Sequence, residues 1–161
     1  MDKEMFTKCV LEAEDTLYHV AKTILHNDSD CEDAVQEAIL QAYANVKTLR
    51  NQAYFKTWLV RILINECYKI CRNQKQSVPY EEYMEQSQAE SENRQTGLWD
   101  IIKSLDEKYR MVIVLYYVEG YSVKEVAQIL RIPSGTVKSR LSHARKIIEQ
   151  KLRKEEVYLY G

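Results

Sequence analysis

Glycine and proline are scarce in this sequence, which has only four glycines and two prolines among its 161 residues. A β-sandwich or β-barrel needs many tight turns, and such turns depend on these two residues. An all-β fold is therefore excluded. Leu, Ile, Glu, Lys, Gln and Ala, which favour helix, are abundant instead. The composition predicts an all-α protein.

The sequence also lacks a long hydrophobic run. No apolar stretch approaches the roughly 20 residues that a membrane-spanning helix requires. The first residues, MDKEMFTKCVLEAED, carry acids where a secretory signal would carry basic residues. We therefore expect a cytoplasmic location, in which the four cysteines, Cys9, Cys31, Cys67 and Cys71, remain reduced thiols.

Sequence motifs of catalysis and metal binding are missing as well. There is no P-loop, nucleophile elbow, HExxH sequence or paired-carboxylate motif. Cys67 and Cys71 are one helical turn apart, but no His or acid is spaced to complete a four-ligand zinc site. We therefore predict a protein that is not an enzyme and that uses no cofactor and no metal.

The sequence has almost no excess of either charge, since the net charge is −1. The charged residues are nevertheless unevenly distributed along the chain. Residues 1–46 carry three Lys or Arg against ten Asp or Glu, whereas residues 47–75 carry seven against one. Residues 76–97 carry one Arg and five Glu, and residues 131–154 carry eight Lys or Arg and one Glu. Two basic segments separated by acidic ones are typical of a protein that contacts phosphate at two places. Solvated helix faces would explain the charges equally well.

Three stretches of the first half have the apolar spacing of amphipathic helices. They cover residues 3–26, a segment that starts at a capping box of Ser29 and Glu32, and residues 54–72. Trp58 shares the apolar stripe of Phe55, which favours a core position over a role as a stacking platform. These stretches predict a three-helix domain over residues 1–75. Residues 76–97 have almost no aliphatic side chains and predict a flexible acidic linker.

The second half, residues 98–154, contains a helix-turn-helix pattern and is followed by a short tail, residues 155–161. Ser122 and Glu125 form a capping box for a short helix, and a longer helix, capped by Ser134, follows the break at residues 131–134. A small residue is needed where the two helices cross, and Ala127 supplies it. Lys, Ser and His side chains on the outer face of the longer helix can bond base edges. A plain helical hairpin is the alternative.

The segment SVKEVAQILRIPSGTVKSRLSHARKIIEQKL closely resembles the −35 reading region of extracytoplasmic-function (ECF) sigma factors of the sigma-70 family. Upstream, DCEDAVQEAILQAY followed by FKTWLVRILINECYKICR is similar to the other conserved region of that family. Two blocks in this order distinguish the chain from other helix-turn-helix activators. The resemblance implies an all-α fold of two small domains, region 2 over residues 1–75 and region 4 over residues 98–154, joined by the flexible acidic linker.

The resemblance also implies partners and the residues that contact them. The partners are promoter DNA and a bacterial core RNA polymerase, contacted through its β′ clamp helices and its β flap. The residues matched to polymerase binding are Asp33, Gln36, Glu37 and Leu40. The residues matched to the −10 element are Leu49, Arg50, Asn51, Tyr54, Lys56, Arg61, Asn65, Lys69 and Arg72.

For the −35 element, the resemblance implies base reading by one group of side chains and backbone contact by another. Lys138, Ser139, Ser142 and His143 match the reading positions, and Thr136, Arg140 and Arg145 match positions nearer the backbone. The full set is Ser134, Thr136, Lys138, Ser139, Arg140, Ser142, His143, Arg145 and Lys146.

Three residues depart from the family pattern. Arg131 occupies a turn position that is often Gly, so positive φ there should cost on the order of 1 kcal/mol. Ser134 stands where many relatives have an apolar residue. His143 stands where Arg is frequent, and neutral His lacks the two-pronged fork that Arg offers to guanine. The preferred promoter sequence is therefore not implied by the resemblance.

The family further implies control by an anti-sigma factor, expected to be membrane-anchored, which would hold this cytoplasmic chain at the membrane. Two other functions remain open from the residues. One is a helix-turn-helix regulator that dimerises on palindromic DNA without polymerase. The other is an interaction module that binds polymerase without promoter specificity.

Overall fold

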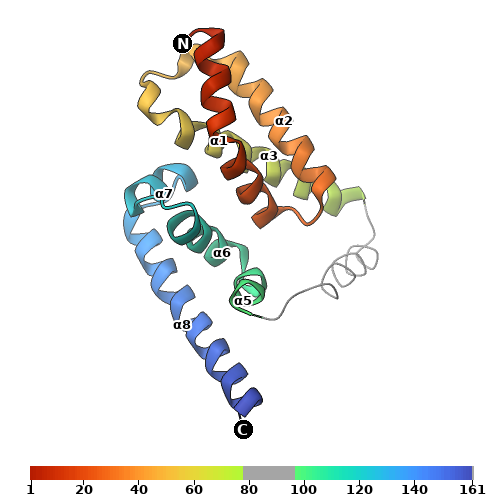
Figure 1. The fold of residues 1–161 in the computed structure, drawn as a ribbon, viewed down its shortest axis with the longest axis vertical. Coiled ribbons are helices and arrows are strands. Elements are labelled where there is room, and N and C mark those ends of the chain that lie inside the picture. Colours follow the sequence, from red (N-terminus) through yellow and green to blue (C-terminus); the bar gives the residue numbers. More distant parts are fainter. Residues whose placement is uncertain (78–96, 161) are drawn as a thin grey trace. The chain divides into compact units, whose positions relative to one another are not determined.

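A computed structural model describes residues 1–77 and 97–160 of the chain, and all regular secondary structure in these ranges is helical (Figure 1). The chain divides into two compact units, Met1–Ser91 and Glu92–Gly161, here called unit 1 and unit 2. The prediction of an all-α protein with two helical domains is confirmed. The linker predicted for residues 76–97 falls mostly outside the described residues.

Unit 1 is built from three long helices. The first two begin where a polar side chain accepts a hydrogen bond from a first-turn N–H, as Asp2 does from Met5 N at 2.8 Å. A nine-residue connection with two short 3₁₀ turns links the second helix to the third. The elements are α1 Lys3–Ile24, α2 Asp28–Asn45, η1 Val46–Thr48, η2 Gln52–Tyr54 and α3 Phe55–Ser77.

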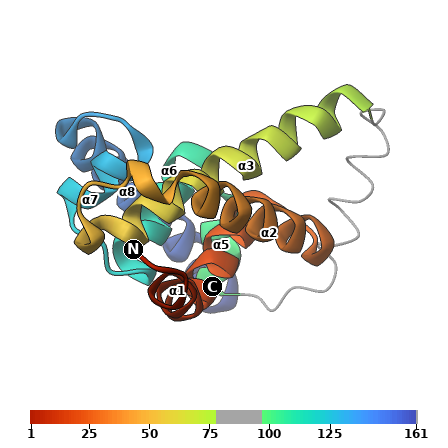
Figure 2. The same cartoon turned by 90° about the horizontal axis from the view of Figure 1, so that it is seen from above.

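The three helices of unit 1 pack around one apolar core. Contacts between Phe6 and Tyr43 at one end, and between Lys22 and Asp28 at the other, show that α1 and α2 are antiparallel (Figure 1). The helix α3 lies alongside α2 and runs antiparallel to it (Figure 2). The predicted stripe is confirmed for the buried core residues Phe6, Ala13, Leu17, Val20, Ala21, Phe55, Leu59 and Leu63, whereas Trp58 is only half-buried.

Polar contacts also fix the register of α2 against α3. Gln41 Nε2 donates to Glu66 Oε1 at 2.6 Å, and Glu66 is buried. Near the opposite ends of the same helices, Gln74 Nε2 donates to Asp30 Oδ2. Two side-chain contacts at separated points prevent one helix from sliding along the other. They therefore fix which side chains of α2 face away from α3.

Unit 2 consists of short helices packed against one long helix. A segment with i to i+5 hydrogen bonding, η3, ends the second helix, and Glu119 N donates to Val114 O at 2.9 Å there. Gly120 follows with φ of 76°, a conformation that favours glycine. The elements are α5 Leu98–Ser104, α6 Glu107–Ile113, η3 Val114–Val118, α7 Val123–Leu130 and α8 Ser134–Tyr160.

Several predicted helix ends are wrong. Asn27, not Ser29, caps α2, because Asn27 Oδ1 accepts from Asp30 N at 2.8 Å. Ser134 is the first residue of α8 rather than its cap, since the Pro133 carbonyl accepts from Val137 N at 3.2 Å. The helix α8 also continues to Tyr160, through most of the predicted tail. The capping box of Ser122 and Glu125 is confirmed.

Candidate nucleic-acid and protein interfaces

The helices α7 and α8 form the predicted helix-turn-helix. Ala127 on α7 and Val137 on α8 are both buried where the helices meet. Arg131 forms the turn with φ of 57° and ψ of 47°, so it adopts the left-handed conformation expected at this position. A non-glycine residue in this region stores strain. The turn therefore keeps its geometry despite the unfavourable residue.

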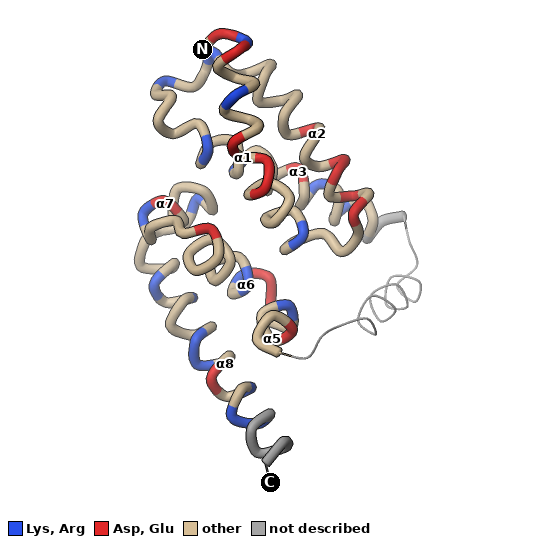
Figure 3. Tube along the Cα trace, in the orientation of Figure 1, with Lys and Arg blue, Asp and Glu red and all other residues tan. Residues whose placement is uncertain are grey.

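The outer face of α8 carries a basic strip, defined here as Lys138, Ser139, Ser142 and Lys146. All four side chains are exposed, and they fall within about 100° of helix rotation. The opposite face buries Val137, Leu141 and Ala144 against α6 and α7. Figure 3 shows cations recurring along α8. The predicted reading residues, apart from His143, thus project together from one side of the helix.

The remaining predicted −35 residues lie at the margins of the basic strip. Thr136 and Arg140 are half-buried on one flank, and Ser134 is exposed at the helix start. Arg145 lies on the other flank, where its Nη1 donates to the hydroxyl of Tyr117 at 2.9 Å. His143 is exposed but stacks on the ring of Tyr109, with centroids 4.9 Å apart and planes 15° apart.

Both aromatic partners were missed by sequence reasoning. Tyr109 comes from α6 and Tyr117 from η3, so each lies at least 28 residues from the side chain that it contacts. Only the crossing of α6 and α8 brings these residues together, and periodicity within one helix carries no information about it.

The helix α2 carries an acidic strip, defined as Asp33, Gln36, Glu37 and Leu40. The four side chains are exposed and lie opposite the buried small residues of the same helix. Leu40 is 64% exposed, which is high for a large apolar side chain. Acidic positions along α2 are visible in Figure 3. The structure therefore brings all four predicted polymerase-binding residues onto one surface.

The predicted −10 residues lie in the connection before α3 and on α3 itself. Leu49, Arg50 and Asn51 belong to the connection between η1 and η2, and Tyr54 ends η2 with 53% exposure. The α3 side chains sharing one face are Arg61, Asn65, Lys69 and Arg72.

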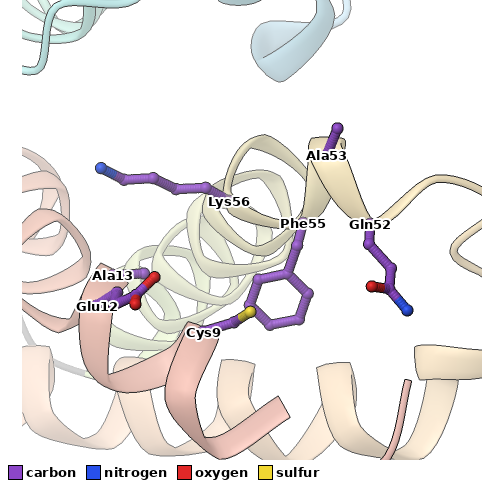
Figure 4. Close-up of a pocket in the computed structure, with 7 residues that line it drawn as sticks. All are labelled: Cys9, Glu12, Ala13, Gln52, Ala53, Phe55 and Lys56. Carbon is purple, nitrogen blue, oxygen red and sulfur yellow. The ribbon is translucent and has the colours of Figure 1, made fainter. Parts of the chain in front are cut away.

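Lys56 does not belong to that face of α3. It precedes Asn65 by nine residues, about two and a half turns, and so points to the opposite side of the helix. There it lines a pocket of about 260 Å³ between α1 and the start of α3 (Figure 4). The other lining residues are Cys9, Glu12, Ala13, Gln52, Ala53 and Phe55. Lys56 and the other predicted −10 residues of α3 therefore lie on different sides of the helix.

One titratable group of unit 2 is strongly perturbed by burial. The ring of Tyr121 is buried beside the capping box of α7, and this burial raises the pKa of the phenol well above its ordinary value of about 10. The carboxylates of Glu119 and Glu125 add to the effect. Its hydroxyl is buried without a hydrogen-bond partner among the described residues. The group therefore stays protonated and neutral.

Within residues 1–77 and 97–160, no group of three or more His, Cys, Asp or Glu side chains is arranged to hold a metal ion. Over the same residues, no helix combines the length and the apolar character needed to cross a bilayer. The surfaces that stand out are those of α2, α3 and α8.

Together, the fold and these surfaces define a two-unit helical protein with a cation-lined helix-turn-helix. Comparison of the sequence with known protein families identifies the class more narrowly. The sigma-70 region 2 family matches residues 9–77, and the sigma-70 region 4 family matches residues 96–148.

Individual relatives agree with the family matches. The RNA polymerase sigma factor SigV of Bacillus subtilis is 30% identical, covering 96% of this chain and 95% of its own. The ECF RNA polymerase sigma factor SigW of the same organism is also 30% identical, covering 94% and 91%. The chain belongs to the ECF sigma factors of the sigma-70 family.

Solved structures agree on the fold. The sigma factor RpoE of Bartonella quintana, crystallised with the anti-sigma factor NepR, superimposes with a TM-score of 0.75 at 23% identity. The match covers 93% of this chain and 98% of that one. The all-helical architecture is therefore one that sigma factors adopt.

Proposed function

We propose that this ECF sigma factor binds bacterial core RNA polymerase through unit 1, recognises a −10 element and a −35 element, and assists strand opening. The observation that carries the proposal is the basic strip of Lys138, Ser139, Ser142 and Lys146 on the second helix of a helix-turn-helix. Such a helix fits the major groove, where cations and hydroxyls can bond base edges. The polymerase supplies the chemistry, and the sigma factor selects the site.

The acidic strip of α2 is proposed to contact the β′ clamp helices of the polymerase. Exposed carboxylates steer a basic partner into contact, and an apolar side chain gives the contact a centre that excludes water. Asp33 and Glu37 supply the charge, and Leu40 supplies the apolar group. Unit 2 is proposed to reach the β flap of the same polymerase.

The −10 element is proposed to bind along α3 and the connection before it. Single-stranded DNA is held by cations that track the phosphates and by aromatic rings that stack on bases. The cations are Arg61, Lys69 and Arg72 on one face of α3, beside the amide of Asn65. Lys56, on another side at the start of the helix, is proposed to add a further cation. Tyr54 supplies an exposed ring, and Leu49, Arg50 and Asn51 supply a loop that could receive a flipped base.

At the −35 element, base reading is proposed for Lys138, Ser139, Ser142 and His143. Phosphate contact is proposed for the flanking residues, because contacts with phosphate position a protein without reading sequence. These are Ser134, Thr136, Arg140, Arg145 and Lys146.

An anti-sigma factor is proposed to restrain the free protein by covering the acidic strip and the basic strip together. The proposal is supported by RpoE of Bartonella quintana, which was crystallised with an anti-sigma factor. A membrane-anchored inhibitor would hold this cytoplasmic chain at the membrane until it is released. Pull-downs from the native cell under non-inducing conditions test this step. Recovery of polymerase without any inhibitor would contradict it.

Run-off transcription tests the central proposal. Purified protein is added to sigma-free bacterial core polymerase on genomic DNA fragments, and the start sites are mapped. Defined starts that depend on the protein are expected, and the aligned upstream sequences then give both promoter elements. If the polymerase stays silent while the protein alone shifts duplex DNA, an independent helix-turn-helix regulator is the better account. If the protein binds polymerase but selects no promoter, an interaction module is.

A further inference from the structure

We infer that Tyr109 is a positioning residue for promoter specificity, because it fixes the plane in which His143 can read a base. The inference rests on the proposed function and adds a residue that lies outside the reading helix. Its starting point is the stack between the two rings, with centroids 4.9 Å apart and planes 15° apart. The two rings come from different helices, α6 and α8.

The imidazole of His143 needs such support more than an arginine would at the same position. A ring nitrogen of His bonds a base edge only along a direction in the ring plane. A histidine that rotates about its side-chain bonds would present its nitrogens in many directions. The stack removes most of these orientations before DNA arrives, which reduces the entropy lost on binding.

Tyr109 is suited to hold the imidazole because its own ring is held on unit 2. The side chain of Tyr109 is half-buried, whereas His143 is exposed. Lys108 Nζ lies 5.0 Å from the centre of the Tyr109 ring, a cation–π contact that further favours one ring position. Tyr109 is therefore the more fixed member of the pair.

Tyr117 provides a matched comparison within the same unit. Its hydroxyl accepts a hydrogen bond from Arg145 Nη1 at 2.9 Å, and its ring packs edge-on against Tyr116. Ala144, which is fully buried, separates Arg145 from His143 along α8. The helices α6 and α8 pack against each other within unit 2 (Figure 1). One tyrosine thus holds a proposed base reader, and the other holds a proposed phosphate contact.

The two tyrosines should therefore have different effects on DNA recognition. Loss of the Tyr109 ring should relax the preference for one base pair, the same one that His143→Ala relaxes. Loss of the Tyr117 hydroxyl should weaken all promoters alike, because phosphates are the same at every sequence. A purely structural role for Tyr109 would also weaken all promoters alike, so the pattern across positions separates the two roles.

The test uses the full chain with core polymerase on promoters in which every −35 position is randomised, followed by sequencing of the transcripts. In Tyr109→Leu, the preference at the His143 position should fall by about three- to tenfold, while preferences elsewhere are kept. Tyr109→Phe keeps the ring and should restore the wild-type profile. The double variant Y109L/H143A should match H143A alone, since both changes remove the same function. Tyr117→Phe should lower transcript yield evenly.

A second measurement checks the stack without polymerase. The sequence has only three histidines, so the ring protons of His143 can be assigned by comparison with H143A. In the wild type and Y109F, the aromatic ring at position 109 should shift these NMR signals, and the shift should vanish in Y109L. If Y109L fails to fold, Tyr109→Met, which keeps more of the packing volume, takes its place.

Three outcomes would overturn the inference. If the wild type prefers particular −35 bases and Y109L has the same profile, this inference falls while the proposed −35 recognition stands. An even loss at every −35 position in Y109L has the same consequence. If the wild type directs transcription without any −35 preference, both this inference and the proposed −35 recognition fall.

Discussion

The helices α2 and α8 present two exposed polar surfaces of different composition. The acidic strip of α2 includes Leu40, and Tyr43, which is 51% exposed, follows one turn later. The basic strip of α8 contains only lysines and serines. Both helices bury small or branched apolar residues on the opposite face. The two helices thus use the same packing rule but offer different outer faces.

This difference indicates different kinds of partner. Protein interfaces depend on a few apolar side chains that become fully buried, with charges around them. DNA offers phosphates and base edges, so cations and hydroxyls suffice. An apolar group within the acidic strip therefore favours a protein partner, and its absence from the basic strip favours DNA. Substitutions in each strip test whether the two surfaces are as separate as this comparison implies.

The largest expected effect is the loss of polymerase binding in Leu40→Asp. A buried charge at the centre of an interface should weaken binding to core polymerase by about 2 kcal/mol or more, roughly 30-fold. Leu11→Asp is the matched control, because Leu11 on α1 is 63% exposed against 64% for Leu40. Affinity is measured by fluorescence anisotropy with labelled protein. Equal losses in the two variants would show that the acidic strip has no special role.

The converse substitution is Lys138→Ala in the basic strip. It should weaken −35 recognition by about 1–3 kcal/mol if Lys138 bonds a base edge, while polymerase affinity is kept. Lys154→Ala, on the same helix but outside the basic strip, is the control. Footprinting of the polymerase complex measures the effect. An unchanged footprint would remove Lys138 from the base-reading residues.

Much of the fold could be predicted from the sequence because its helices are strongly amphipathic. Val137, Leu141 and Ala144 repeat at the spacing of one helical face, and all three are buried. The start of α2 could not be predicted in the same way, because Asn27, Asp28, Ser29 and Asp30 are all competent caps. Only the packed structure decides among neighbouring residues of equal propensity.

The candidate site was predictable only where its residues lie on one helix. The four residues of the acidic strip fall on one face by spacing alone. The same rule places Lys56 and Asn65 on opposite sides of α3. The contacts of His143 with Tyr109 and of Arg145 with Tyr117 depend on how α6 crosses α8, which no local pattern encodes.

A smaller effect is expected from the turn that holds the basic strip in place. Arg131 is the one non-glycine with positive φ among the described residues. Arg131→Gly should stabilise unit 2 by about 1 kcal/mol, because glycine adopts this conformation without strain. Arg131→Ala, which keeps the strain, is the control and should give no such gain.

The two tryptophans let each unit be followed by itself in this experiment. Trp58 lies in unit 1 and Trp99 in unit 2, so urea unfolding is monitored by Trp99 fluorescence in a Trp58→Phe background. The reverse background, Trp99→Phe, reports on unit 1. A shift of both transitions by the same amount would mean that the units do not unfold independently.

The smallest effect is expected at Tyr121, which lies in unit 2 beneath the start of α7. Its buried hydroxyl has no partner among the described residues, so Tyr121→Phe should stabilise unit 2 at neutral pH by about 0.5–1 kcal/mol. Tyr54→Phe, which alters an exposed hydroxyl in unit 1, is the control and should leave the Trp99 transition unchanged.

The gain at Tyr121 should also depend on pH. Burial raises the pKa of Tyr121 in the folded state, so above pH 10 the unfolded chain loses this proton while the folded chain keeps it. The wild type therefore loses stability as pH rises past 10, and Y121F is spared this part of the loss. The difference between the two proteins should be larger at pH 10.5 than at pH 7. A difference that stays constant would show that the hydroxyl is hydrated in solution and that unit 2 is looser there than its packing indicates.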